Sequence, residues 1–520
     1  MKINKMKNLF SCLLLLLLVG TLSAQDTQNT EFKVHKVDYK LSYEILGMKG
    51  EPDLGMAGIG ADLFIFEKVP NLYLTLNSYS AVTGERPGLI SFGAGLGYVQ
   101  PLFNSPLAID AGIFLGGGGG AGAPDGGGLI TREHINLSYH LKNFSLFGGY
   151  SRLDFPTGDM GGNNFNFGVS LSSVFETAYP VSGNDGELIT DAELKKSRFR
   201  FTLLGSRYLH FFNGPFTSSF VTGSQNKNIQ LVGIGIDKFI DDKFYVALKL
   251  SGAVTGGIDG YMSYLIGLGF EQPLWTRKLT LDMQALGGPS GGGGIASGGG
   301  ATLQGTLGLR AHLGNQYEFK AALGQTWAPE GNFNGTFLEL GLSRNFNFIS
   351  PERDLDKPYG LKPDEKLHGF GFGILNRTYF SPAGTDKSGN KYDELFNLIG
   401  FKVSKKLNKH FTALGSTYWA YQGSYGAYAE GWLGMQYNSP FAATWDVHTQ
   451  FMGGAAGGGG IDLGSGLAFH YGLGLSKTIG NNWLLSLDAG KMQGIRGKFK
   501  PYYLDFGIGY RFFQVEKYIK

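Results

Sequence analysis

Cysteine is nearly absent from this 520-residue chain, because Cys12 is the only one and it lies close to the N-terminus. Without further cysteines the chain can form no intramolecular disulfide and no thiolate-based metal site. Net charge is also small, +3 at pH 7, which argues against nucleic-acid binding as the main activity. We therefore expect no nucleic-acid partner and no cofactor.

A long apolar run is missing after the N-terminal leader. The leader itself has three lysines, an apolar run from Leu9 to Val19 and the small residues Ser23 and Ala24. That pattern predicts a secretory signal peptide over residues 1–24. Beyond it no stretch of 18 or more apolar residues occurs, so a helical membrane span is not expected. Cys12 precedes the leucine run instead of following it, which excludes a lipoprotein acylation site.

Glycine and aromatic residues are what the chain has in excess. Glycine accounts for 84 of 520 residues, and aromatic residues for 14%, whereas glycine averages near 7% in proteins. A secreted, glycine-rich, aromatic-rich chain without disulfides has the composition of an outer-membrane β-barrel. The alternative is a secreted adhesin or fibrous protein, and the periodicity of the apolar residues distinguishes the two classes.

Three glycine-rich stretches recur in the same context, which indicates an internal repeat. Each stretch comes after a proline landmark and an alternating segment that carries an aspartate. The stretches are Leu115–Gly128, Leu286–Gly300 and Met452–Gly466; the prolines are Pro101, Pro273 and Pro440; the aspartates are Asp110, Asp282 and Asp446. We divide the chain into repeats at 34–179, 198–348 and 367–513, joined by linkers at 180–197 and 349–366.

Each repeat is predicted to contain eight strands. In the second repeat they fall at 198–212, 229–240, 243–256, 260–275, 278–288, 299–313, 317–329 and 333–348. In Lys243–Leu250 the apolar residues alternate with Tyr245, Ala247 and Lys249, which is the period of a strand with two different faces. The predicted lengths suit tilted transmembrane strands better than a soluble sandwich. Tight turns alternate with longer loops, the asymmetry of outer-membrane barrels.

The last predicted strand, Leu504–Phe512, has Phe506, Ile508, Tyr510 and Phe512 on one face. It resembles the C-terminal β-signal of bacterial outer-membrane barrel proteins, although seven residues follow Phe513. The resemblance is to the barrel class as a whole. It implies an antiparallel up-and-down β-barrel in the outer membrane of a Gram-negative-type bacterium, with lipid and the barrel-assembly machinery as partners.

One barrel of 24 strands and three linked barrels of eight strands both fit this pattern. We prefer three, because the two linkers are longer than a continuous sheet needs. Charges of both signs on the inner faces also suit a narrow lumen in which they can pair. In the second repeat these are Arg200, Asp237, Lys249, Asp282, Arg310, Glu318, Lys320 and Glu339. The inward glycines Gly233, Gly235, Gly267 and Gly269 argue for the larger barrel, because they fill a small lumen poorly.

The glycine stretches are the main interaction candidates. They lack the phosphate-binding patterns of nucleotide sites, and no helix is expected after them. Backbone without side chains permits close approach, so we expect the hairpins to pack against one another near a pseudo-threefold axis, or on a partner. In a single barrel they would narrow the pore. The candidate residues are Gly116, Gly117, Gly118, Gly291, Gly292, Gly293, Gly457, Gly458 and Gly459, with Asp110, Asp282 and Asp446.

Three other clusters have structural interpretations that we prefer. Asp446 and His448 share an inward face, which favours a hydrogen-bond network in the lumen over a general base. The loop 385–394 has spaced carboxylates and amides but not the ligand order of a calcium loop. An aromatic group around one hairpin is interpreted as an interfacial girdle, with carbohydrate stacking as the alternative: Tyr418, Trp419, Tyr421, Tyr425, Tyr428 and Trp432.

The sequence thus predicts an integral outer-membrane β-barrel with no catalytic residues, no metal site and no enzymatic activity. In the three-barrel form it has a structural or partner-docking role. In the one-barrel form it is a porin-like transport or secretion pore gated by a partner. The third hypothesis is an outer-membrane lipid-modifying enzyme.

Overall fold

The computed structural model describes residues 29–48, 51–181, 188–212, 228–275, 278–355, 357–380, 384–393, 395–480 and 482–518. Within these ranges the chain is all-β, with 25 strands and one short 3-10 helix, Asp191–Glu193. In this part of the chain no helix is long and apolar enough to cross a membrane. The predicted signal peptide lies outside the described residues.

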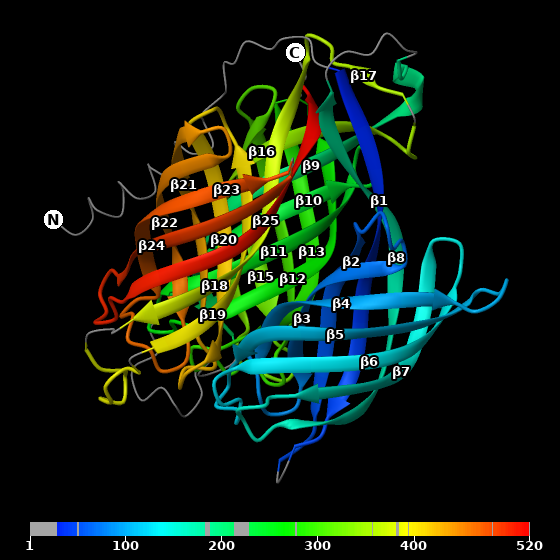
Figure 1. The fold of residues 1–520 in the computed structure, drawn as a ribbon. Coiled ribbons are helices and arrows are strands. Elements are labelled where there is room, and N and C mark those ends of the chain that lie inside the picture. The colour runs from blue at the N-terminus through cyan, green and yellow to red at the C-terminus, as the bar shows by residue number, and fades with distance from the viewer. Residues whose placement is uncertain are drawn as a thin grey trace.

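The first eight strands, blue to cyan-green in Figure 1, close into a ring. β1 pairs antiparallel with β2 on one side and with β8 on the other, from Asn29↔Val181 to Glu44↔Asn166. The strands of this first ring are β1 Asn29–Leu46, β2 Leu54–Phe64, β3 Leu72–Thr83, β4 Ile90–Pro101, β5 Leu107–Gly119, β6 Leu129–His140, β7 Phe144–Asp154 and β8 Gly161–Val181. Closure gives every strand two partners, so no sheet edge remains.

The next eight strands form a second ring. β9 pairs with β10 and, along seventeen residues from Leu194↔Pro351 to Phe211↔Gly335, with β16. The strands of the second ring are β9 Leu194–Phe211, β10 Gln230–Phe239, β11 Phe244–Thr255, β12 Met262–Pro273, β13 Leu279–Gly291, β14 Ala301–His312, β15 Tyr317–Trp327 and β16 Gly335–Pro351.

The last eight strands form a third ring, yellow to red in Figure 1. β18 pairs with β19 and with β25, from Glu365↔Lys517 to Phe380↔Tyr502. The strands of the third ring are β18 Glu365–Phe380, β19 Leu395–Lys406, β20 Phe411–Gln422, β21 Ala429–Ala442, β22 Trp445–Gly457, β23 Leu467–Ile479, β24 Trp483–Gly494 and β25 Tyr502–Lys517.

The all-β class and the antiparallel barrel pairing are confirmed. Each of the eight segments predicted for 198–348 coincides with one strand of β9–β16, to within about four residues at either end. The predicted total of 24 strands is one too few. The additional strand, β17 (Tyr359–Gly360), pairs with Asn29 and Thr30 of β1, and a two-residue strand is too short to produce a periodic pattern.

Side chains alternate between the two faces of each ring, as the sequence predicts. In β13, Asp282 is fully buried inside the second ring, whereas the neighbouring Met283 is 44% exposed on the outside. The outer faces carry large apolar residues on all three rings, among them Leu41, Ile113, Leu137, Leu268, Leu307, Leu323, Leu473, Phe506 and Ile508. An exposed belt of this kind on a closed ring is what a membrane-facing surface requires.

The rings are joined where their last strands meet. Phe513 of β25 pairs with Ala178 of β8, and Val515 of β25 pairs with Ile349 of β16. Glu516 lies between the second and third rings, where it contacts Arg344 at 3.2 Å and His368 at 2.9 Å. Residues 513–516 of β25 thus tie the ends of β8, β16 and β18 together.

Candidate functional site

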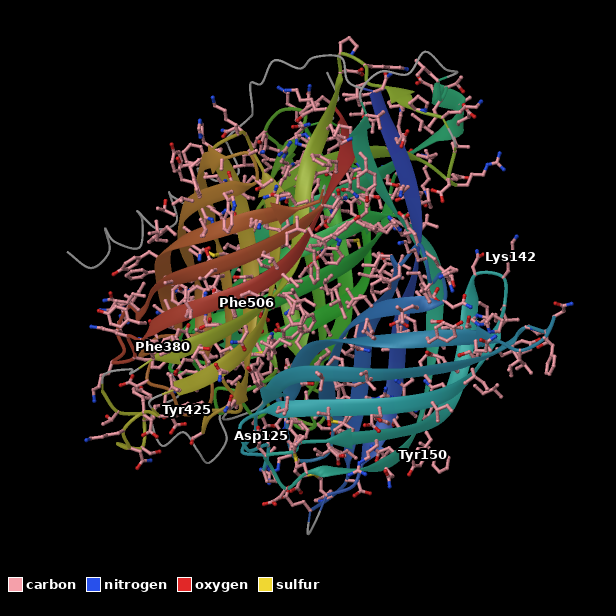
Figure 2. The ribbon with its side chains drawn as sticks, viewed as in Figure 1. Asp125, Lys142, Tyr150, Phe380, Tyr425 and Phe506 are labelled. Atoms are coloured by element: carbon pink, nitrogen blue, oxygen red, sulfur yellow. The ribbon has the colours of Figure 1, made fainter. Side chains whose placement is uncertain are left out.

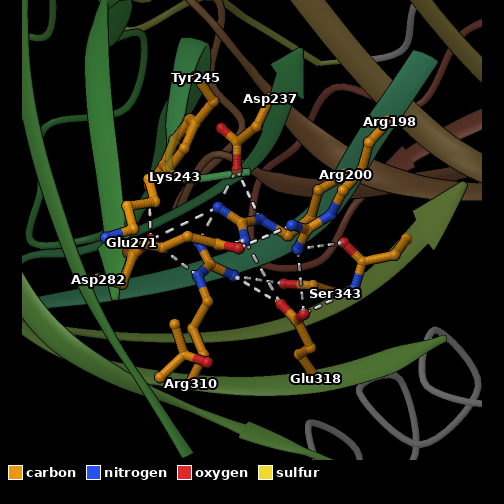
Figure 3. A network of polar contacts seen from close by, with 12 residues as sticks. Arg198, Arg200, Asp237, Lys243, Tyr245, Glu271, Asp282, Arg310, Glu318 and Ser343 are labelled. Carbon is orange, nitrogen blue, oxygen red and sulfur yellow. Dashed lines mark hydrogen bonds and ion pairs between the residues drawn. The ribbon is translucent and has the colours of Figure 1, made fainter. Parts of the chain in front are cut away.

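The interior of the second ring is filled by one network of paired charges (Figure 3). Arg200, fully buried, donates to Asp237 at 2.8 Å and to Glu271 at 2.6 Å. Arg310 contacts Asp282 at 2.9 Å. All eight charged residues predicted for this lumen are buried in it, and each lies in at least one ion pair: Arg200, Asp237, Lys249, Asp282, Arg310, Glu318, Lys320 and Glu339.

Glu271 belongs to this network and is absent from the predicted set. It shares the inward parity of Gly269 on β12, so strand alternation could have identified it. Gly269 itself explains how glycine fills a narrow ring. A Cβ there would overlap the ring of Tyr245, whose hydroxyl donates to Asp282 at 2.5 Å. The glycine makes room for a tyrosine that occupies the lumen, so inward glycines do not require a wide barrel.

The first and third rings are filled on the same principle. In the first, Lys40 pairs with Asp62 at 2.5 Å and with Asp110 at 2.7 Å. In the third, Arg377 pairs with Asp505 at 2.8 Å and with Glu430 at 2.7 Å. Three tyrosines surround Arg377, with the ring centroids of Tyr418, Tyr503 and Tyr379 at 3.9, 4.2 and 5.7 Å from the guanidinium carbon. Buried charges that are paired in this way are compatible with a low-dielectric interior.

Asp446 does not occupy the position of Asp110 and Asp282, contrary to the prediction. Asp446 is opposite Pro440, whereas Pro273 is opposite Thr280. Each proline is opposite the residue two before the lumen position, so in the third ring that position belongs to His448, and Asp446 is equivalent to Thr280. His448 lies 2.5 Å from Asp488 of β24, so the predicted pairing of His448 with a carboxylate exists, but the partner is not Asp446.

The three glycine hairpins connect β5 with β6, β13 with β14 and β22 with β23. They share one backbone conformation. Ala123, Ile295 and Ile461 each donate a backbone hydrogen bond to a glycine three residues earlier, at 3.0, 3.1 and 3.1 Å. At the same place Gly293 and Gly459 have φ values of 59° and 58°, in the left-handed region that favours glycine.

Each hairpin packs against the loop between the third and fourth strands of another ring. The hairpin of the second ring meets the first ring, where a Cβ on Gly291 would lie 2.5 Å from the Cα of Gly88. The hairpin of the third ring meets the second, where a Cβ on Gly457 would lie 2.7 Å from the Cα of Gly260. The contacts are backbone against backbone, which a side chain would prevent.

The hairpin of the first ring completes the cycle on the third ring. A Cβ on Gly117 would lie 2.6 Å from the carbonyl oxygen of Trp419, and one on Gly128 would lie 2.5 Å from that of Ala420. Among the predicted residues, Gly292 and Gly458 lie at these contacts through their backbone, because a Cβ on Gly88 or Gly260 would meet their nitrogen atoms. A Cβ on any of the remaining predicted glycines, or on these two themselves, would meet atoms of its own ring: Gly116, Gly118, Gly292, Gly293, Gly458 and Gly459. The hairpins therefore pack on loops of neighbouring rings and not on one another.

Large side chains are distributed unequally where the rings meet. Ser80, Gly252 and Trp419 occupy equivalent positions, each at the end of the ladder between the third and fourth strands of its ring. Trp419 is 2% exposed and packs against Phe92 of the first ring and Tyr264 of the second, at centroid distances of 6.4 and 5.9 Å. Trp419 of the third ring thus fills space where the three rings meet.

The aromatic group of the third ring is not an interfacial girdle. Tyr418, Tyr428 and Trp432 are at most 2% exposed and belong to the apolar cluster of the ring interior. Tyr425, in the loop that receives the first hairpin, is 4% exposed. Side chains without accessible faces can neither anchor in lipid headgroups nor stack on carbohydrate. The prediction failed because Tyr418, Tyr428 and Trp432 point into their own ring, whereas Trp419 is covered by neighbouring rings.

The described part of the predicted loop, residues 385–393, contacts the second ring. The Asp386 carboxylate accepts backbone hydrogen bonds from Ser388 and Asn390 at 2.9 and 2.8 Å, and Lys387 pairs with Asp259 at 2.6 Å. Asp386 thus holds a turn, and Lys387 supplies the cation of an ion pair between the third and second rings. Within the described ranges no group of three or more histidine, cysteine or acidic residues could hold a metal ion.

Asp125 is a buried carboxylate at the contact between the first hairpin and the third ring (Figure 2). It is 8% exposed, and its Oδ2 accepts a hydrogen bond from the backbone N–H of Gly120 at 2.7 Å. A Cβ on Gly426 of the third ring would lie 2.7 Å from its Oδ1. Burial raises the pKa of Asp125 to about 6, although the hydrogen bond from Gly120 and the charge of Arg86 act in the opposite direction.

The free energy of unfolding should therefore depend on pH through Asp125. The pKa of Asp125 is higher in the folded state than in the unfolded chain. Its contribution to the free energy of unfolding is therefore fully present below about pH 4 and is lost as pH rises through about 6. Asp125→Asn should remove up to about 3 kcal/mol of this dependence, at about 1.4 kcal/mol per pKa unit. Urea unfolding in detergent between pH 4 and 8 measures it. Asp159→Asn, on an exposed aspartate of the neighbouring loop, is the control, and an unchanged pH slope in Asp125→Asn would contradict the assignment.

Comparison with known proteins gives fold neighbours only. No family model matches the chain, and no match was found among curated protein sequences. Solved structures similar to it include the outer membrane protein OpdK of Pseudomonas aeruginosa (11% identity, covering 92% of this chain and 99% of that one, TM-score 0.21). The siderophore receptor PirA of Acinetobacter baumannii is another (9% identity, 94% and 81% covered, TM-score 0.25). OccK5 of Pseudomonas aeruginosa is a third (10% identity, 93% and 98% covered, TM-score 0.21). These neighbours are bacterial outer-membrane β-barrel proteins, the class that the sequence resembles.

Proposed function

We propose that the protein is a non-conducting structural protein of the bacterial outer membrane, built from three copies of an eight-stranded barrel. The observation that carries this proposal is the filling of the rings by buried ion pairs and tyrosines, as around Arg200 and Arg377. An interior of eight strands is just wide enough for side chains to fill. Such rings offer no path for a solute, so a structural or partner-docking role fits better than transport.

Membrane insertion is supported by the outer faces of the rings. Their exposed leucine, isoleucine and phenylalanine side chains form belts, and most strands are 10–13 residues long, the length that a tilted strand needs to cross a bilayer. We propose that membrane lipid surrounds these belts. We also propose that the barrel-assembly machinery recognises β25.

The glycine hairpins have a structural role in this proposal. They join the three rings in a cycle, so that a protein partner would dock on other loops or on the tight turns. A non-enzymatic role is proposed as well. His448 and Asp488, the acid–imidazole pair of the third ring, are 2% and 0% exposed inside it, where no outer-leaflet lipid would reach them.

The rival function is a single large pore. It would require β8 to continue into β9, and β16 into β18, as one sheet of 24 strands. Within the described ranges β8 instead pairs along its length with β1, and β16 with β9. Each ring thereby uses its own first strand for closure, which supports the scaffold over the pore.

Planar-bilayer conductance tests the proposal. The purified full chain should insert without nanosiemens-scale channel steps, whereas a general porin reconstituted in the same membranes should produce them. Insertion is verified separately by flotation of the proteoliposomes and by the heat-modifiable mobility of the folded chain on gels. Regular large openings from the inserted chain would overturn the scaffold proposal in favour of the pore.

A further inference from the structure

A groove on the outer wall of the second ring takes no part in the contacts described above. It is a shallow depression, largely open to the outside, with a volume of about 630 Å³. The outward residues along it are Leu268, Ala285, Gly305, Gln325 and Thr336, with Phe270, Met283, Leu307 and Leu323 beside them. It lies in the exposed apolar belt, with Gln325 and Thr336 as its polar end.

The groove follows a row of directly opposed residues across five strands. Leu268 is opposite Ala285, Ala285 opposite Gly305, Gly305 opposite Gln325, and Gln325 opposite Thr336. Two taller rows border it. On one side Met283 is opposite Leu307, and on the other Leu303 is opposite Trp327. Small side chains between large ones create the depression.

The other two rings have no such depression in the same row. In the third ring Met435, Phe451, Tyr471, Lys491 and Tyr502 are opposed in that order. In the first ring the row is Leu96, Ile113, Glu133, Arg152 and Asn163. Where these rings carry Phe451 with Tyr471 and Ile113 with Glu133, the second carries Ala285 with Gly305.

The backbone does not require glycine at this place. A Cβ on Gly305 would meet only the carbonyl oxygen of Gln284, at 3.9 Å. Gly305 therefore differs from the hairpin glycines, which lie against other backbone. Its missing side chain leaves space on the membrane side and relieves no contact within the protein.

We propose that this groove binds one acyl chain of a phospholipid with a net-neutral headgroup. The inference rests on the proposed membrane location of the outer face. An apolar groove open to the bilayer buries a hydrocarbon chain, and each buried methylene contributes about 0.8 kcal/mol. Gln325 and Thr336 offer neutral hydrogen-bonding groups at its polar end. The equivalent row carries Lys491 in the third ring, whereas Arg152 of the first ring is paired with Asp154 at 2.5 Å, so an anionic headgroup would be drawn to the third ring.

Exchanging residues between rings tests the site. Ala285→Phe with Gly305→Tyr gives the second ring the side chains that the third ring already holds at the same positions. Native mass spectrometry of the full chain, extracted from membranes of defined phosphatidylethanolamine and phosphatidylglycerol content, counts the lipids retained. The native chain should retain one phosphatidylethanolamine that the double variant loses.

The reverse exchange is the matched control. Phe451→Ala with Tyr471→Gly should open a second groove and add one retained phospholipid. Equal lipid numbers in the native chain and in the filled variant would overturn the site, as would selective retention of an anionic lipid. Heat-modifiable mobility of both variants shows that they remain folded. Failure of the proposed function would appear differently, as channel steps or as absent flotation.

Discussion

Gly457→Val is expected to separate the second and third rings and to lower the free energy of unfolding by about 1–3 kcal/mol, the usual cost of overpacking. A Cβ at this position would overlap the backbone nitrogen of Gly260 and lie 2.9 Å from the carbonyl carbon of Asp259. Both contacts are to backbone, so no side-chain rotation relieves them. The loop must move away from the hairpin.

The ion pair between Lys387 and Asp259 provides the measurement, because it joins the same two rings at 2.6 Å. Zero-length carbodiimide cross-linking followed by peptide mass spectrometry should detect this pair in the native chain and lose it in Gly457→Val. Gly291→Val, which disturbs the contact of the second ring with the first, should be destabilised to a similar degree and keep the cross-link.

Gly431→Val is the control within the third ring. Gly431 is exposed, and a Cβ on it would meet no atom within 4 Å. This variant should unfold like the native chain and keep the cross-link. If Gly457→Val also kept both its stability and the cross-link, the close packing of hairpin on loop would not be what joins the rings.

The parts of the fold that depend on local order were predictable. Alternation placed Lys249, Asp282 and Glu339 inside the second ring because a strand has two faces whatever it packs against. The three hairpins were also predictable, because each glycine stretch recurs in the same sequence context. Even Glu271, absent from the predicted set, has the parity of an inward residue.

Features that depend on how the rings meet were not predictable. Nothing local says that the hairpin at Gly291 contacts Gly88, some 200 residues earlier in the chain. Trp419 has the sequence context of an interfacial aromatic residue and becomes 2% exposed only because two other rings cover it. Asp446 was misplaced for a different reason, because it follows its proline by six residues whereas Asp110 and Asp282 follow theirs by nine, a difference that the sequence itself shows.

Arg200→Ala should be the most damaging single substitution in the second ring. Arg200 lies within 4 Å of four carboxylates, those of Asp237, Glu271, Asp282 and Glu318. Truncating it leaves acidic groups without their partner in an interior that water does not reach. Removing one member of a buried ion pair costs about 3–5 kcal/mol, measurable as a lower urea midpoint in detergent.

Arg198→Ala separates this effect from simple loss of positive charge. Arg198 also pairs with Glu271, at 2.8 Å, but its side chain is 29% exposed, so its removal should cost no more than about 1 kcal/mol. Glu271→Gln in the Arg200→Ala background should recover part of the loss, because one uncompensated charge disappears. If Arg200→Ala and Arg198→Ala were equally mild, the lumen would be hydrated, and the filled interior on which the non-conducting scaffold rests would be wrong.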